Sequence, residues 1–398
     1  MGLFVVPSVA AAAGDVQPPL DPLTVAGGQE VGRCGWPTAV ALRGEGFPFC
    51  TGTLVHPRVV LLAAHCIDPD FGWGGPVEVG FGEDGFEPVS TIGTVVCDWH
   101  PQWNEGNTEG FDVAYCVLNQ DAVLDFVPPL MGCEWDVMSP GTEIPIVGYG
   151  ADVGIFDPEE GWIFTSGNGP KRTAPQRLEG VFDNAAFLLG DDAGGCPGDS
   201  GGPAMVQMPD GTWRVIGAAS RIHPESPPSE TNACGYGTVY STFAHVMPWL
   251  EQETGVDLTP CHDANGSWQP DERCDAMPLF PGEPRATSGT WQDACATTQL
   301  SLPGQLCGPP FTEPPPEPPP EPPPLPPPEL PPEPPPEPPP SDSDDLPGGT
   351  GDESGGSSDD GLDFAGDGFV DRGCACGSRP RPAGWGRQPQ RAQAPPPR

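Results

Sequence analysis

The sequence predicts an all-β folded region that is followed by a long segment without a hydrophobic core. Two stretches, 36–42 and 50–57, alternate and turn as strands with one buried face do. Two apolar runs, one ending at His65 and one starting at Asp112, are typical of buried strands. The 60 prolines and 55 glycines among 398 residues are too many for globular structure throughout, so part of the chain is linker.

The cysteine content and the charge limit where the protein can work and what it can bind. None of the 14 cysteines lies in a Cys-x-x-Cys metal pattern, which favours disulfides and an oxidising compartment. We therefore expect a secreted or extracellular-surface protein. The formal net charge of −40, with Lys171 as the single lysine, argues against binding to nucleic acids or anionic membranes.

The glycine-rich stretch Cys196–Pro203 carries the strongest chemical signal. Glycines on both sides of Ser200 allow a tight turn that brings backbone N–H groups close to whatever the hydroxyl attacks. A serine nucleophile needs a histidine base and a buried carboxylate that orients the base. His65 and Asp112 are the upstream candidates. A glycine-rich turn without chemistry is the alternative reading of this stretch.

The order His, Asp, Ser, each in its local motif, resembles the chymotrypsin/trypsin family of serine proteases from about residue 25 to about residue 255. The resemblance implies two antiparallel six-stranded β-barrels with the active site between them. Ser200 would attack the peptide carbonyl, His65 would transfer the proton and Asp112 would orient His65. The N–H groups of Gly198 and Ser200 would hold the oxyanion, and no cofactor would be needed.

The expected activity is that of a monomeric serine endopeptidase that forms an acyl-enzyme with protein or peptide substrates. In the family, the residue six before the nucleophile lies at the floor of the substrate pocket, and here it is Gly194. This floor carries no charge for Arg or Lys. We expect Gly237 to leave one wall open and Ile222 to shorten the pocket, which favours small or medium apolar side chains. Ser220 is expected to support Asp112.

The same resemblance implies two disulfides, makes the segments of a third pair adjacent strands, and leaves two cysteines to pair with each other. The expected bonds are Cys50–Cys66, Cys196–Cys234, Cys97–Cys116 and Cys34–Cys133. The resemblance also implies a helix at 243–254, where the periodicity is helical, and Gly255 should end it.

The beginning of the chain predicts export and activation by cleavage. Residues 2–13 look like the apolar core and cleavage region of a signal peptide, so residues 1–24 would be a signal remnant and propeptide. The stretch Val25–Gly28 resembles the family's activation site, where the new ammonium pairs with Asp199. Because Thr24 is not basic, the activating protease should not be trypsin-like.

Three further segments follow the protease region. Residues 256–310 contain four cysteines and could form a binding module or an extension that packs on the protease, held by two internal disulfides. Residues 311–372 should be a polyproline stalk and a disordered acidic spacer. The tail 373–398 begins like the C-terminal sorting tag of myxobacterial surface proteins, in a truncated or frame-shifted form. No apolar run in the tail is long enough to span a membrane.

Two alternatives remain open at this point. The acidic loop from Asp68 to Glu87 could bind calcium, but a solvated loop is favoured and we assign no metal. The rival to an enzyme is a non-catalytic adhesin or binding protein that uses the barrels as a scaffold. Labelling of Ser200 by a fluorophosphonate discriminates between these two functions.

Overall fold

The computed structural model describes residues 25–104, 110–157, 161–226, 232–275, 277, 279, 290–295 and 307–312. The chain divides into two units, Met1–Pro318 and Pro319–Arg398, and all described residues belong to the first. Our expectations for the signal segment, the proline stalk, the acidic spacer and the terminal tail concern residues outside this set. None of the helices in the described ranges has the length and apolarity needed to cross a membrane.

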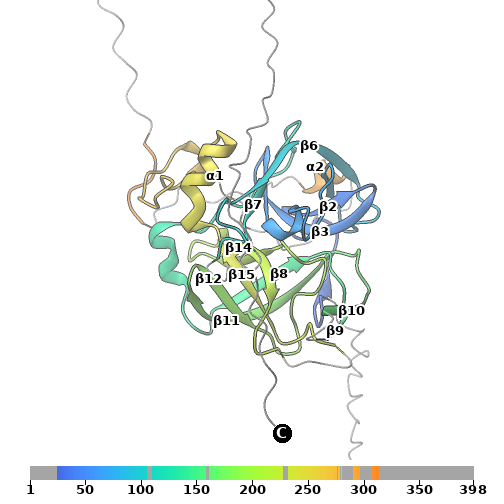
Figure 1. Ribbon diagram of the computed structural model, residues 1–398. Helices are drawn as coiled ribbons and strands as arrows, with labels where there is room; N and C mark the ends of the chain where they lie inside the picture. Colours follow the sequence, from blue (N-terminus) through green and yellow to red (C-terminus); the bar gives the residue numbers. More distant parts are fainter. Residues whose placement is uncertain are drawn as a thin grey trace, which may run out of the picture. The chain divides into compact units, whose positions relative to one another are not determined.

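The first half of the folded unit is a closed antiparallel barrel in the order β2-β3-β4-β7-β6-β5 (Figure 1). Its strands are β2 Ala39–Gly44, β3 Phe47–His56, β4 Val59–Leu62, β5 Glu78–Phe81, β6 Ser90–Trp99 and β7 Ala114–Leu118. β2 and β4 are buried along their whole length, which agrees with their nearly unbroken apolar sequences. The strands predicted at 36–42 and 50–57 correspond to β2 and to the second half of β3.

The second half is another six-stranded antiparallel barrel, in which β8 pairs with both β13 and β11 and so closes the sheet β8-β11-β12-β15-β14-β13. Its strands are β8 Glu143–Gly148, β11 Arg172–Phe182, β12 Ala185–Leu189, β13 Pro203–Gln207, β14 Trp213–Ile222 and β15 Gly237–Thr242. The short strand β1, Gln29–Glu30, pairs with β11, and β9 Val153–Asp157 pairs with β10 Gly161–Ser166. The all-β, two-barrel prediction is therefore confirmed.

The helix α1, Met247–Thr254, follows the last strand of the second barrel but packs on the first. Met247 and Leu250 are fully buried in the core of the first barrel. The Trp249 ring meets the Tyr115 ring of β7 edge to face at 5.6 Å. Gly255 caps the helix with φ 70°, a conformation that favours glycine, so the helix ends where the sequence predicted. The helix therefore ties the two barrels together.

Four expected disulfides can be compared with the structure, and one of them is wrong. The bonds Cys50–Cys66, Cys97–Cys116 and Cys196–Cys234 are present. Cys34 and Cys133 do not pair with each other. Cys34 bonds to Cys295 and Cys133 bonds to Cys307, so both partners come from the segment after the helix.

The segment after α1 packs against the barrels and contains only one internal disulfide among its described residues, Cys261–Cys274. The Trp213 indole of β14 donates to the Leu279 carbonyl at 3.1 Å. In the short helix α2, Trp291–Cys295, the Trp291 indole donates to the Glu83 carboxylate at 2.7 Å. The expectation of two internal disulfides is therefore wrong, because the other two cysteines are bonded to the barrels.

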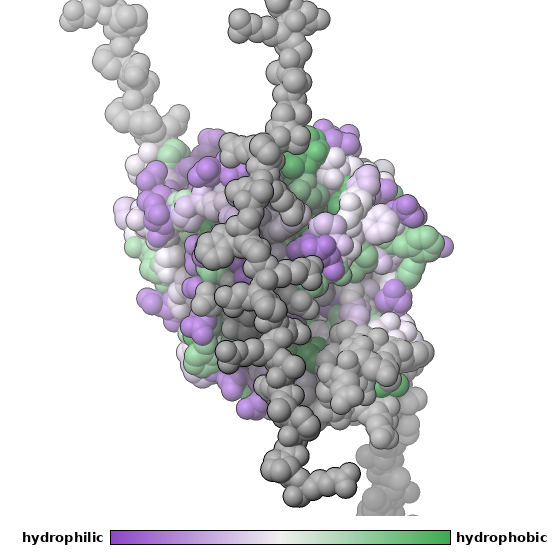
Figure 2. All heavy atoms as spheres, viewed as in Figure 1, coloured by the Kyte–Doolittle hydropathy of each residue, from purple (hydrophilic) through white to green (hydrophobic). Residues whose placement is uncertain are grey.

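The described surface in Figure 2 is mostly hydrophilic or intermediate, with hydrophobic residues scattered over it. Among the described residues, Phe47, Val95 and Val123 are the large apolar side chains with the greatest exposure, at 66%, 67% and 73%. Scattered apolar residues of this kind are normal on a protein surface and do not by themselves mark a binding site.

Candidate active site

His65 is held at the edge of the first barrel by its neighbours in the chain. It lies in the short 3₁₀ helix Ala64–Cys66 that follows β4, and the Cys50–Cys66 bond ties this helix to β3. The backbone N–H of His65 donates to Oδ1 of Asp112 at 2.9 Å, and its ring Nδ1 lies 2.7 Å from Oδ2. The side chain is 25% exposed, so one edge of the ring is open to the cavity.

Asp112 precedes β7 and is 3% exposed. Its Oδ2 also accepts the Ser220 hydroxyl at 2.7 Å, so its two oxygens accept bonds from both His65 and β14. Burial raises the pKa of Asp112, but the charge and hydrogen bonds of His65 outweigh it and leave the pKa below its usual value. Burial likewise lowers the pKa of His65, but the charge and hydrogen bond of Asp112 raise it overall above 6.5.

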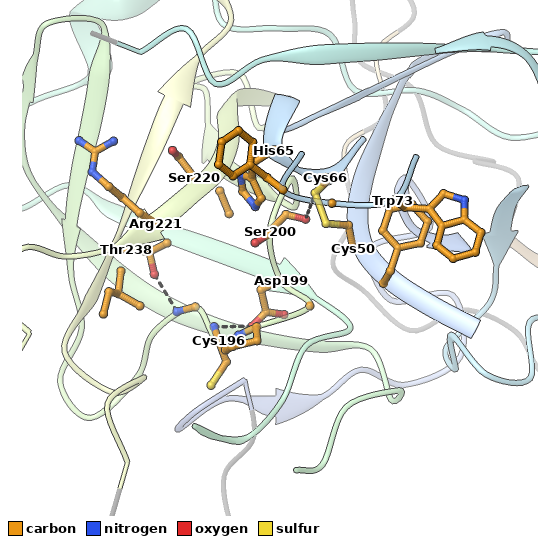
Figure 3. Close-up of a pocket in the computed structure, with 18 residues that line it drawn as sticks. Cys50, His65, Cys66, Trp73, Cys196, Asp199, Ser200, Ser220, Arg221 and Thr238 are labelled. Carbon is orange, nitrogen blue, oxygen red and sulfur yellow. Dashed lines mark hydrogen bonds between the residues drawn. A yellow bond between two sulfur atoms is a disulfide. The ribbon is translucent and has the colours of Figure 1, made fainter. Parts of the chain in front are cut away.

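The loop that carries Ser200 rests on β3 of the first barrel. The N–H of Thr51 donates to the Ser200 carbonyl at 2.9 Å, and its hydroxyl donates to the Gly198 carbonyl at 2.8 Å. Gly198 has φ 100° and Gly201 has φ 79°, both in the region that favours glycine. A Cβ on Gly201 would lie 2.4 Å from the Thr51 carbonyl oxygen. The glycines of the motif therefore allow the loop to approach the first barrel closely enough to place Ser200 beside His65 (Figure 3).

Asp199 is buried behind this loop and is held by backbone donors. Its carboxylate accepts the N–H of Gly150 at 2.8 Å and the N–H of Cys196 at 2.9 Å. Burial raises the pKa of Asp199 to about 6, although both hydrogen bonds and the charge of Arg172 act in the opposite direction. A Cβ on Gly150 would lie 2.5 Å from the carboxyl carbon, so this position has to be glycine. Our sequence analysis missed Gly150, and the Gly-Tyr-Gly run at 148–150 was the available signal.

The amino-terminal end of the described chain reaches the same region. Val25 and Ala26 are 1% and 0% exposed. The Ala26 carbonyl accepts the N–H of Gly194 at 3.0 Å, and Ala26 packs with the Cys196–Cys234 bond. Residues that we expected at a newly formed amino terminus therefore lie in a buried position close to the loop of Asp199.

A cavity of about 690 Å³ opens between the two barrels and is lined by His65 and Ser200. Ser220 and Ile222 also line it, as we expected. Gly194 and Gly237 are not among the described residues that line it, and Gly195 and Thr238 are found there instead.

A side chain at either glycine would point toward the backbone of a neighbouring segment. A Cβ on Gly194 would lie 2.0 Å from the Cys234 carbonyl oxygen, and one on Gly237 would lie 2.2 Å from the Leu188 carbonyl oxygen. Both residues therefore face backbone rather than the cavity. Thr238 forms the wall, and its hydroxyl accepts the N–H of Gly195 at 2.7 Å (Figure 3).

Sequence reasoning also missed an aromatic wall and a cation. Phe49, Phe71 and Trp73 line the cavity, and the rings of Phe49 and Trp73 are stacked with centroids 5.8 Å apart. Arg221 lines it as well, and Figure 3 shows Arg221 and Trp73 on opposite sides of Ser200. The position of Arg221 between Ser220 and Ile222 was the signal that could have identified it.

Two groups of Cys and His side chains in the described residues lie close enough to share a metal ion, Cys50–His65–Cys66 and Cys133–His262–Cys307. In each group the two cysteines form a disulfide. Because a cysteine binds a metal ion as a free thiolate, the sulfur atoms of these groups cannot serve as metal ligands while the disulfides are intact.

Comparisons with known proteins agree with this geometry. Residues 25–250 match the family model described as Trypsin. Chymotrypsin-like elastase family member 1 of Macaca fascicularis is 26% identical over 244 residues, which cover 57% of this chain and 88% of the relative. Chymotrypsin-like elastase family member 3A of Homo sapiens is 26% identical over 56% of this chain and 87% of the relative. Tryptase of Mus musculus is 25% identical over 59% of this chain and 90% of the relative.

Proposed function

The chain belongs to the trypsin family, and we propose from this that it is an exported serine endopeptidase that hydrolyses peptide bonds through an acyl-enzyme. The observation that carries the proposal is the hydrogen bonding of His65 to Asp112 in the cavity that Ser200 lines. Asp112 accepts from the backbone and the ring of His65 at once, which orients the ring and leaves Nε2 for Ser200.

In this mechanism His65 Nε2 removes the proton from Ser200 as Oγ attacks the carbonyl carbon of the substrate. The resulting imidazolium is stabilised by the Asp112 carboxylate and then gives its proton to the departing amine. Water attacks the acyl-enzyme in the same way, with His65 again as the base. The second step releases the acid product and restores Ser200.

The oxyanion would be held by the N–H groups of Gly198 and Ser200. Among the described residues, neither N–H donates to a protein acceptor, so both are available. The bond from the Thr51 hydroxyl to the Gly198 carbonyl supports this role. It fixes the peptide unit between Gly198 and Asp199, which lies between the two donors, before a substrate arrives.

We propose that the pocket prefers small or medium apolar side chains before the scissile bond. Thr238 and Ile222 occupy its walls. Among the described residues that line it, Asp199 has the only carboxylate, and this group already accepts the N–H groups of Gly150 and Cys196. A buried Arg or Lys would find no free partner there, and an unpaired buried cation is costly. The elastase names of several relatives agree with such a pocket.

We further propose that cleavage before Val25 by another protease produces the active form, with the new ammonium on Asp199. The burial of Val25 and Ala26 and the raised pKa of Asp199 support this, because a buried carboxylate gains from a cation. The six disulfides fit an oxidising, extracellular compartment.

The test is a fluorophosphonate label and a peptide library, applied to the processed protein. We expect the label on Ser200 and cleavage after small apolar residues. Ser200→Ala should fold normally and lose roughly 10⁶-fold in turnover. Near-normal hydrolysis by Ser200→Ala would contradict the assignment. A folded, processed protein that does not label would favour the non-catalytic binding protein instead.

A further inference from the structure

Arg221 is an isolated cation on the wall of the cavity. It lies in β14 between Ser220 and Ile222, and its guanidinium carbon lies 6.0 Å from the centroid of the Phe187 ring of β12. Among the described residues no carboxylate lies within ion-pair distance of it. Six other arginines do form such pairs: Arg43, Arg58, Arg172, Arg177, Arg214 and Arg273.

This isolation is unexpected in a chain with 56 acidic residues and only 16 basic ones. Asp112 is the acidic group whose charge acts on Arg221. Its carboxylate already accepts hydrogen bonds from His65 and Ser220. The carboxylate of Glu179 lies 3.0 Å from Nε2 of His223, the residue two positions after Arg221. The guanidinium therefore keeps its hydrogen-bonding fork free for a group that enters the cavity.

The direction of β14 indicates which part of a substrate Arg221 meets, provided that the proposed function holds. An extended substrate would pair antiparallel with 220–222, with the residue before the scissile bond in the pocket of Thr238 and Ile222. In an antiparallel pair, directly opposed residues share a face, and diagonal neighbours lie within reach of long side chains. The second residue before the scissile bond would then lie opposite Arg221, and the fourth would lie diagonal to it.

A carboxylate is the group that best fits this position. The planar guanidinium presents parallel N–H donors that match the two oxygens of Asp or Glu, and it stays charged at all relevant pH values. The cavity is partly enclosed, so an ion pair formed there is less screened than one on an open surface. The guanidinium lies over the ring of Phe187, so the ring covers one of its faces. The N–H edge of the guanidinium is left for the substrate.

We propose that Arg221 forms a subsite that selects substrates with aspartate or glutamate two or four residues before the scissile bond. This inference rests on the proposed endopeptidase activity and adds to it a second, charge-based selection beyond the apolar pocket. The enzyme would then cleave after small apolar residues in acidic stretches of protein.

The experiment measures kcat/KM for pairs of peptides that differ only by Asp against Asn, or Glu against Gln, at these two positions. For the wild-type protein we expect the acidic peptide to be favoured about tenfold at one position or both. Arg221→Gln should remove the preference, Arg221→Lys should keep part of it, and Arg221→Glu should favour lysine in its place. Arg177→Gln, which removes an exposed cation of the same barrel that does not line the cavity, should leave the preference unchanged.

The outcomes separate this inference from the proposed function. Every variant is first labelled with a fluorophosphonate, and the labelling rate of Ser200 reports whether the variant is folded with a working triad. Cleavage of neutral peptides without any acid preference would overturn the role of Arg221 and leave the protease intact. An acid preference that survives in Arg221→Gln would do the same. If the wild-type protein neither labels nor cleaves, the proposed function fails and the subsite fails with it.

Discussion

The size of the substrate pocket can be tested at Thr238, where shape and hydrogen bonding can be changed separately. The Thr238 hydroxyl accepts the N–H of Gly195 at 2.7 Å, and its methyl carbon lies 3.0 Å from the position that a Cβ on Gly195 would take. Thr238→Ser keeps the acceptor and removes the methyl group. Thr238→Val keeps the shape and leaves the Gly195 N–H without its acceptor.

The structure gives a different magnitude for each change. A buried CH₂ is worth about 0.8 kcal/mol, so Thr238→Ser should shift the preference for leucine over alanine by about fourfold in kcat/KM. Ile222→Ala, which removes three carbons from the residue paired with Thr238 on the adjacent strand β14, should shift it by about 2 kcal/mol, or roughly 30-fold. Thr238→Val should leave the preference unchanged but lower the free energy of unfolding by about 1–3 kcal/mol, because it leaves a buried donor unpaired.

The assay compares kcat/KM for peptides with Ala, Val, Leu or Phe before the scissile bond, together with denaturant unfolding of each variant. The serine and valine variants are matched controls for each other. If both change the size preference to the same degree, the wall does not act through the volume of Thr238. If neither Thr238→Ser nor Ile222→Ala alters it, these residues do not bound the pocket.

Two further predictions concern the triad and the disulfides. Because His65 must be neutral to act as a base and Asp112 raises its pKa above 6.5, kcat/KM should fall as the pH drops through that raised value. A pH–rate profile checks this, and Asp112→Asn should lower the rate by about 10⁴-fold and move the acid limb to lower pH. Replacing Cys133 and Cys307 together by serine should lower the free energy of unfolding by about 2–4 kcal/mol and leave kcat/KM unchanged. Denaturant unfolding of the active, labelled protein measures it, and an unchanged stability would show that the bond does not restrain the chain.

The His65–Asp112 pair also affects stability, and the sign of the effect is opposite for the two groups. The raised pKa of His65 means that its pairing stabilises the fold below about pH 6.5 and that this contribution is lost as the pH rises through the folded pKa. The lowered pKa of Asp112 gives stability above about pH 4, which is lost as the pH falls through its folded value. The pair therefore stabilises the fold most between these limits.

Local motifs identified three candidate residues that lie at one cavity in the structure. Residues 65, 112 and 200 are far apart in the chain, but each stands in a short stretch whose glycines, cysteines or apolar residues fix its own backbone. The exact position along a strand has less local signal. Among the described residues Thr238 lines the cavity and Gly237 does not, and a shift of one residue changes the face of the sheet to which a side chain points.

The bond between Cys34 and Cys133 could not be excluded from sequence, because pairing depends on distance in space. The predicted bond between Cys34 and Cys133 assumed that the cysteines of the protease region pair only with one another. The extension supplies both partners instead: the Cα atoms of Cys34 and Cys295 lie 5.1 Å apart, and those of Cys133 and Cys307 lie 5.9 Å apart. Sequence separations of 261 and 174 give no local signal for such pairs.

These two bonds also indicate what the extension does. Cys34 lies ahead of the first barrel strand, and Cys133 lies in the 3₁₀ helix Gly132–Val137 between β7 and β8. Near the first bond, Oε1 of Glu83 accepts both the Cys34 N–H at 2.6 Å and the Trp291 indole at 2.7 Å.

Near the Cys133–Cys307 bond, the buried Glu134–Arg214 ion pair, at 2.8 Å, joins the 3₁₀ helix of Cys133 to β14. A segment of this length buries little core of its own. The two disulfides bond the extension to the protease region at two points, as expected of an extension that packs on the protease.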